Sequence, residues 1–103
     1  MHVVTNRVFV HPDWQHEFET RFEQRAGQIE SQPGFKKMQI LKPNSDQAPY
    51  VVYTEWQSEA AFKQWVGSDD FKLAHQNPMP DEAFTQKGML EQHTIIILSL
   101  IHI

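Results

Sequence analysis

Two hydrophobic periods alternate along this chain, and their order constrains the fold more than any other feature of the sequence. Apolar residues alternate with polar ones, or β-branched and aromatic residues cluster, in "VVTNRVFV", "FKKMQILK" and "YVVYTEW", which predicts three strands. Between the first two, Trp14, Phe18, Phe22 and Ile29 recur at helical spacing. A second helical pattern follows the third strand, and a fourth strand follows Gly88. The predicted order is β-α-β-β-α-β.

This order predicts an α+β fold, a ferredoxin-like sandwich in which an antiparallel four-stranded sheet carries both helices on one face. The 103 residues are enough for one domain, so we assign residues 1–103 to a single domain. Few residues are left to cover the other face of the sheet. We therefore expect a second copy of the chain to cover that face.

Local signals predict where the helices begin and end. Pro12-Asp13 is expected to start the first helix, and Pro33-Gly34 is expected to stop it. Ser58 is a good N-cap residue for the second helix. Gly67 interrupts that helix, and the following "SDD" can cap a renewed turn through "FKLAH".

Composition excludes several classes of protein. Lys and Arg total 9 against 13 Asp and Glu, a net charge of -4, which argues against a nucleic-acid partner. The absence of cysteine excludes disulfides, thiolate catalysis, iron–sulfur clusters and zinc-thiolate sites. The start "MHVVTNRVFV" lacks the pattern of a signal peptide, so we expect a cytoplasmic protein.

The chain ends in the apolar run "TIIILSLIHI". This run is far shorter than the ~20 residues that span a bilayer, so no membrane partner is expected. Its β-branched and aliphatic residues predict a buried strand with an extension.

Asn6 is unusual in the first predicted strand. Alternation places it on one face with Val4, Val8 and Val10, although asparagine is depleted in strands. A buried amide without hydrogen-bond partners costs roughly 1–3 kcal/mol. Two interpretations stay open: the side chain is satisfied by backbone at a strand bulge, or it is a donor that points into a pocket.

Trp65 and His75 flank the interruption at Gly67. Trp65 fits plain core packing or a pocket wall, and His75 fits a surface or capping residue or a metal ligand. One histidine cannot build an all-protein zinc site, but it is sufficient as the axial ligand of a haem iron. In a continuous helix the two residues would lie about 15 Å apart along the axis, so a joint site needs the break. The apolar walls for haem would come from Phe62, Trp65, Val66 and Phe71.

Arg21 and Arg25 lie one helical turn apart on one stripe of the first predicted helix. We interpret both as solvent-facing, with contact to an anion as the alternative. The sequence contains no glycine-rich phosphate loop, Ser-His-Asp pattern or paired-carboxylate motif.

Taken together, these residues resemble the antibiotic-biosynthesis-monooxygenase superfamily, and within it the IsdG-type haem-degrading monooxygenases. The resemblance runs from "VVTNRVFV" through "RFEQRAGQIESQPGFKKMQIL" to "YVVYTEWQSEAAFKQWVGSDDFKLAH". Its specific parts are the "RF..R" helix, the "PGF" before the second strand and the "W.S..AF..W..S..F...H" segment. It implies a homodimer that packs sheet against sheet as a dimeric α/β-barrel. The chain departs from the family in the loop from Gln76 to Gly88 and in the apolar tail.

The resemblance implies a site built from Asn6, Trp65 and His75. His75 would be the axial iron ligand, Asn6 would donate a hydrogen bond close to the iron, and Trp65 would press on the porphyrin and favour its out-of-plane distortion. Arg21 and Arg25 become candidate partners of the haem propionates, because guanidinium groups match carboxylate geometry. The implied haem-binding residues are Asn6, Phe22, Arg25, Phe62, Trp65, Val66, Phe71 and His75.

The implied activity is that of a haem-degrading monooxygenase. Haem would be both cofactor and substrate, O2 and external electrons would cleave the porphyrin, and iron would be released. A separate reductase or a small reductant is implied, because the chain has no flavin motif and no redox cysteine. Two alternatives stay open: a cofactor-independent monooxygenase of the same superfamily that acts on a quinol or polyphenol, and a haem-binding protein without turnover.

Overall fold

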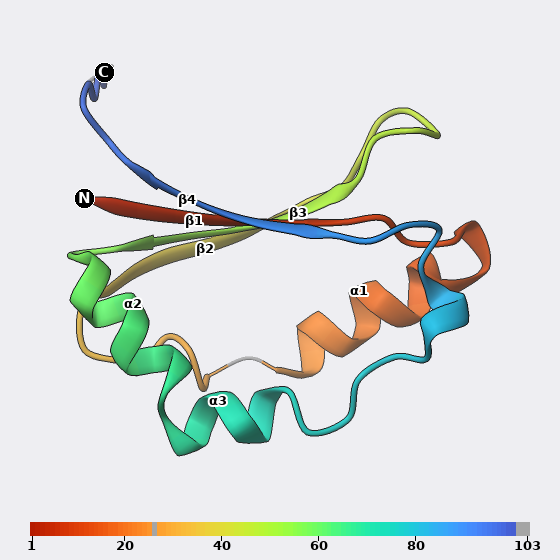
Figure 1. Ribbon diagram of the computed structural model, residues 1–103, viewed down its shortest axis with the longest axis horizontal. Helices are drawn as coiled ribbons and strands as arrows, with labels where there is room; N and C mark the ends of the chain where they lie inside the picture. Colours follow the sequence, from red (N-terminus) through yellow and green to blue (C-terminus); the bar gives the residue numbers. More distant parts are fainter. Residues whose placement is uncertain (26, 101–103) are drawn as a thin grey trace.

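The computed structural model describes residues 1–25 and 27–100 and has the predicted α+β, ferredoxin-like fold (Figure 1). Four antiparallel strands form one sheet in the order β2-β3-β1-β4. The strands are β1 (His2–Val8), β2 (Phe35–Leu41), β3 (Tyr50–Trp56) and β4 (Met89–Thr94). The helices are α1 (Gln15–Gln24), α2 (Glu59–Val66) and α3 (Asp69–Ala74), with short 3-10 turns η1 (Pro12–Trp14) and η2 (Asp81–Ala83).

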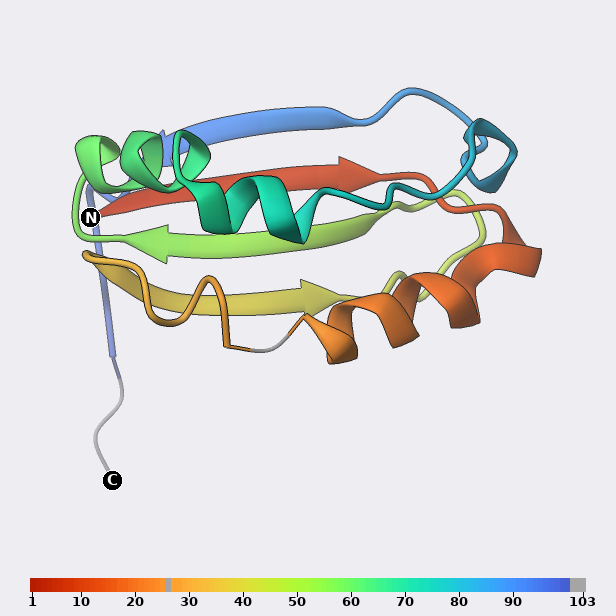
Figure 2. The same cartoon turned by 90° about the horizontal axis from the view of Figure 1, so that it is seen from below.

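All three α-helices lie on the same face of the sheet (Figure 1). Figure 2 shows α3 in front of β1 and β3, whereas α1 lies near β2. Within the described part of the chain, no helix is long and apolar enough to cross a membrane.

The interruption of the second helical region is confirmed. The Ser58 hydroxyl accepts a hydrogen bond from the Ala61 amide (3.2 Å) at the start of α2, which ends at Val66 with Gly67 as its C-cap. The Ser68 hydroxyl then accepts from the Phe71 amide (3.1 Å) and starts α3. Because each helix has its own N-cap, the chain changes direction between them instead of continuing as one rod.

The predicted end of the first helix is wrong. α1 ends at Gln24, well before Pro33-Gly34. Gly27 has a φ of 105°, in the left-handed region that ends a right-handed helix, and its amide donates to the Glu30 carboxylate (2.7 Å). Ile29 therefore lies in a turn, although it still packs against the hydrophobic core.

The prediction that the terminal apolar run is a buried strand is also wrong. β4 ends at Thr94 opposite His2, and one more bond runs from the Ile95 amide to the Met1 carbonyl (3.0 Å). Among the residues described beyond it, none pairs with a neighbouring strand that would satisfy its backbone, and Ile96 is 88% exposed. Figure 1 shows this tail leaving the sheet on the side opposite the helices. Residues 101–103 lie outside the described part.

The hydrophobic core on the helix face is divided into two clusters. The tryptophan cluster, under α2 and α3, consists of Val4, Trp56 and Trp65. The tyrosine cluster, under α1, consists of Val10, Phe18 and Tyr50. Ring contacts hold each one together, such as Phe18 against Tyr50 at 4.7 Å. The space between the two clusters is where a ligand can enter.

No described helix covers the second face of the sheet (Figure 1). Its side chains are mixed in polarity, and polar contacts link them both between and within strands. Arg7 pairs with Glu91 at 3.0 Å, and the Tyr53 hydroxyl donates to Glu55 at 2.6 Å. Lys37 also reaches Glu55, at 3.8 Å. We call this surface the open sheet face.

Candidate functional site

A cavity of about 580 Å³ lies between the helices and the sheet, and mostly apolar side chains line it. Residues of both core clusters contribute, including Val4 and Trp65 from one and Phe18 from the other. Strand alternation brings Val4, Asn6 and Val8 to the cavity side, as the sequence predicted. This volume and lining suit a largely apolar small molecule.

Every residue that the resemblance assigned to haem binding lines this cavity. The set comes from α1, β1, α2 and the α3 region, which lie far apart in the sequence. The members are Asn6, Phe22, Arg25, Phe62, Trp65, Val66, Phe71 and His75. The fold thus brings the predicted residues together, whereas the role of each one stays a prediction.

Asn6 is half-buried in a regularly paired part of β1. It lies opposite Val52 of β3 and Leu90 of β4, and the bulge in this sheet is in β2, between Phe35 and Lys37. The strand-bulge interpretation of Asn6 is therefore wrong. Among the described residues, no side-chain hydrogen bond involves the Asn6 amide, so both its donor and its acceptor are available to a ligand in the cavity.

Trp65 belongs to the core and to the cavity wall at once. Its side chain stacks on Trp56 with ring centroids 6.5 Å apart and meets the Phe71 ring edge-on at 5.4 Å. Only 6% of Trp65 is exposed. Core packing and a role as pocket wall are thus compatible for Trp65, because the residue belongs to the tryptophan cluster and also lines the cavity.

His75 ends α3 with its ring held in one orientation. Its Nδ1 lies 2.9 Å from the Phe71 carbonyl oxygen, and its ring stacks on the Phe71 ring at 4.0 Å. A carbonyl oxygen only accepts hydrogen bonds, so Nδ1 carries the proton in the neutral ring, and Nε2 keeps its lone pair. Ligand histidines of metal sites are oriented in this way, through the second nitrogen.

The break between α2 and α3 lets both residues reach one cavity. Trp65 contacts Phe71, and Phe71 contacts His75. Trp65 and His75 are therefore linked through one aromatic ring, whereas in a continuous helix they would lie far apart along the axis. The prediction that a joint site needs the break at Gly67 agrees with this geometry.

The two arginines are not simply solvent-facing, which corrects that interpretation. Both are half-buried and line the cavity. The Arg25 guanidinium lies 5.0 Å from the Phe22 ring centroid, and burial, together with the neighbouring charge of Arg21, lowers the pKa of Arg25. Because these surroundings disfavour the charged form of Arg25, an anion bound beside its guanidinium group would be favourable.

A second, polar pocket of about 320 Å³ adjoins the cavity at these arginines. Amide side chains and the two guanidinium groups provide most of its polar groups. They are Arg21, Gln24, Arg25, Gln28, Gln76 and Asn77. Since Arg21 and Arg25 line both spaces, an apolar ligand with an acidic edge would have its apolar part in the cavity and its acids beside the arginines.

Sequence reasoning missed several cavity residues. Val52 and Thr54 come from β3, where alternation alone would have identified them. Pro78, Met79 and Phe84 come from the segment after His75, which has no hydrophobic period to indicate an inward side.

The fold and the cavity define a small α+β protein that binds an apolar ligand between its sheet and its helices. The family model for antibiotic biosynthesis monooxygenase matches residues 1–77, and the chain belongs to this family.

The chain is also similar to proteins that act on haem. It is 39% identical over 79 residues, 75% of each chain, to a haem oxygenase (staphylobilin-producing) of Staphylococcus haemolyticus. It is 32% identical over 80 residues to a haem oxygenase (mycobilin-producing) of Mycobacterium tuberculosis, covering 78% of this chain and 75% of that one. The solved structure of the haem-degrader MhuD from M. tuberculosis, with two haems in its active site, superposes with a TM-score of 0.78. This match has 28% identity over 96% of this chain and 99% of the other.

Proposed function

We propose that this protein is a haem-degrading monooxygenase, an oxidoreductase that opens the porphyrin of bound haem and releases iron. The observation that carries the proposal is the orientation of His75, whose Nδ1 is occupied by the Phe71 carbonyl while its ring lines an apolar cavity. The similarity to named haem oxygenases supports the same activity.

The residues present fit haem. A haem iron needs one unprotonated imidazole nitrogen as its protein ligand, and His75 would provide Nε2. The flat apolar macrocycle needs apolar walls, which Phe62, Val66 and Phe71 provide. When bound, haem supplies the iron at which O2 and external electrons react.

The other side chains act on the bound group by position. The Asn6 amide, unpartnered among the described residues, would donate a hydrogen bond to the bound group from the cavity wall. Trp65, fixed by Trp56 and Phe71, would contact the bound macrocycle and favour its distortion. Arg25 is the proposed partner of a propionate. Within residues 1–25 and 27–100 no carboxylate forms an ion pair with Arg25, so its guanidinium group can bind an acidic ligand.

The electrons come from outside the chain in this proposal, because the sequence has neither a flavin motif nor a cysteine. A separate reductase or a small reductant is the proposed source. His75 and the two residues after it are exposed, so we expect such a donor to approach on this side.

The decisive experiment is a titration with haemin, followed by ascorbate in air with catalase present. We expect saturable binding with a Soret band of histidine-ligated haem, then decay of that band into a bilin-like absorbance. Omitting ascorbate is the control and should leave the spectrum unchanged.

The other results of this titration identify the alternatives. A Soret band that persists under ascorbate and air would contradict turnover and favour a haem-binding protein. Absence of saturable binding would contradict the proposal altogether and favour a cofactor-independent monooxygenase acting on a quinol or polyphenol.

We also propose that the protein is a homodimer joined through the open sheet face. The mixed polarity of this face suits an interface that forms ion pairs and hydrogen bonds as well as apolar contacts. Sedimentation equilibrium should give twice the chain mass of 12.1 kDa. Val51→Lys, which adds a cation beside Arg7 on this face, should shift the equilibrium towards monomer.

The matched control is Gln64→Lys, which adds the same charge on the exposed surface of α2. It should leave the dimer intact. A parent protein that sediments as a monomer at micromolar concentration would contradict the proposed interface.

The cellular location and the number of domains stay predictions from the sequence. A cytoplasmic location is tested by fractionating the cells that produce the protein. A single domain over residues 1–103 is tested by a single cooperative unfolding transition.

A further inference from the structure

We propose that Arg21 is a positioning residue for His75, acting as a strap that ties α1 to the chain directly after the iron ligand. This inference rests on the proposed function, because it assigns His75 to the iron. It concerns a contact at the polar pocket, which Arg21 and Asn77 both line, rather than a contact with haem.

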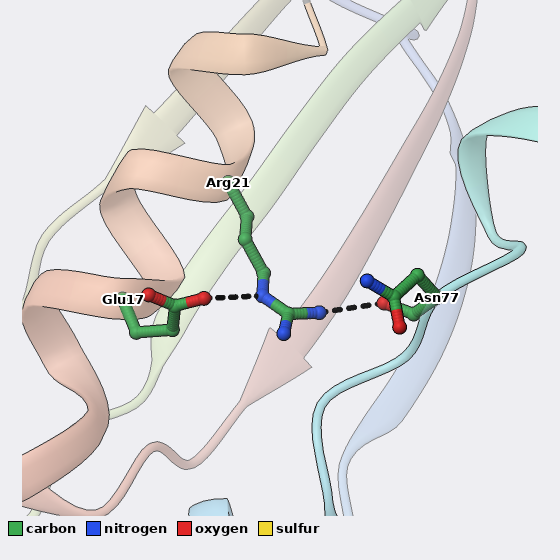
Figure 3. A network of polar contacts seen from close by, with 3 residues as sticks. All are labelled: Glu17, Arg21 and Asn77. Carbon is green, nitrogen blue, oxygen red and sulfur yellow. Dashed lines mark hydrogen bonds and ion pairs between the residues drawn. The ribbon is translucent and has the colours of Figure 1, made fainter.

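Arg21 makes two polar contacts in opposite directions (Figure 3). Its Nε donates to the Glu17 carboxylate at 2.8 Å, one helical turn earlier in α1. Its Nη1 donates to the backbone carbonyl oxygen of Asn77 at 2.5 Å. Asn77 lies two residues after His75, so the guanidinium group joins α1 to the segment that follows the ligand.

α3 needs such an anchor at its C-terminal end. It has only six residues, and helices this short are unstable without tertiary support. Its N-terminal end is held by the Ser68 cap and by Phe71, which packs on Trp65. At the other end Leu73 is 56% exposed and His75 is exposed, so the packing of the last turn rests on Ala74, against the tryptophan cluster, and on the His75 ring, against Phe71.

The segment after the ligand can transmit the restraint. Asn77 precedes Pro78, and a residue before proline is restricted to extended conformations. Fixing the Asn77 carbonyl therefore limits the freedom of Gln76, the one residue between Asn77 and His75. The hydrogen bond from His75 Nδ1 to Phe71 exists only while the last turn of α3 is formed, so the strap maintains the orientation of Nε2.

Arginine suits this role because its planar group donates from Nε and Nη at once, and the Glu17 carboxylate orients it towards the Asn77 carbonyl. Arg25, one turn later, lies over the Phe22 ring instead. The two arginines on this stripe thus have separate roles: Arg21 holds the chain after His75, and Arg25 is available to an acidic ligand.

The test compares three variants of the full chain. Arg21→Gln removes the strap, and Glu17→Gln removes the charge that aims it. Lys63→Gln is the matched control, since Lys63 and Glu59 form an equally short ion pair (2.8 Å) on α2, exposed and outside the cavity. Two readouts are needed: the tautomer of His75 from side-chain ¹⁵N NMR of the haem-free protein, and the Soret band and dissociation rate of bound haemin.

We expect Arg21→Gln to mix the two neutral tautomers of His75, to broaden the Soret band, and to release haemin about 10–100 times faster, as for residues that orient metal ligands. Glu17→Gln should show a smaller change in the same direction, and Lys63→Gln should match the parent. A tautomer unchanged in Arg21→Gln would overturn the strap, whether or not haem binds.

The two proposals fail differently. If the parent binds no haemin, the proposed function fails, while the NMR readout still decides whether Arg21 orients His75. If Arg21→Gln changes the tautomer but leaves the haemin spectrum and release rate as in the parent, positioning of an iron ligand is overturned.

Discussion

Replacing His75 by alanine is expected to abolish the axial histidine signature of bound haem and to lower haem degradation by more than about 100-fold. Loss of a residue that merely orients a ligand costs about 10–100-fold, and loss of the ligand itself should cost more. The His75 ring is exposed and caps α3, so its removal leaves both core clusters intact. The measurement is the rate of Soret decay under ascorbate, with the spectrum of the bound state recorded first.

His16→Ala is the matched control for this variant. His16 is also an exposed histidine, but it lies on α1 and does not line the cavity. It should degrade haem at the parent rate. If His75→Ala also kept the parent rate and spectrum, His75 could not be the iron ligand.

Substitutions of Trp65 should separate its two tasks. Trp65→Ala removes a 6%-exposed side chain from the tryptophan cluster, and such truncations lower the free energy of unfolding by about 3–5 kcal/mol. Urea unfolding measures this loss. Trp65→Phe keeps a ring between Trp56 and Phe71 and should keep most of that stability.

The distortion role predicts a different result for Trp65→Phe. Haem should still bind, because His75 is untouched, but its macrocycle should be flatter and its breakdown slower. Resonance Raman spectra of the bound porphyrin report the flattening. An unchanged breakdown rate and product would leave Trp65 as a core residue only.

The sequence predicted those elements whose signals are local. β3 has its predicted bounds, and both serine caps and the break between α2 and α3 are confirmed. The end of α1 was missed because Ile29 continues the helical spacing while the backbone at Gly27 already turns away. The tail was missed because composition predicts a strand, whereas a strand also requires a neighbour to pair with.

The site, like the fold, could be predicted from the sequence only in part. Residues alone left Asn6, Trp65 and His75 open between ordinary and functional roles, and resemblance to a family provided the assignment. The orientation of His75 through Phe71 depends on a local helix end that sequence could place only approximately. The contact of Arg21 with Asn77 spans 56 positions and involves a backbone carbonyl, which no side-chain pattern encodes.

The division of the core into two clusters gives the ligand a thermodynamic role. The haem-free protein carries a cavity of about 580 Å³ where a domain of this size would normally be packed. A ligand that fills it stabilises only the folded state, by about 2.7 kcal/mol when present at 100 times its dissociation constant. We therefore expect the folded amount of this protein to rise with the supply of ligand, which would link substrate abundance to enzyme abundance without any regulator.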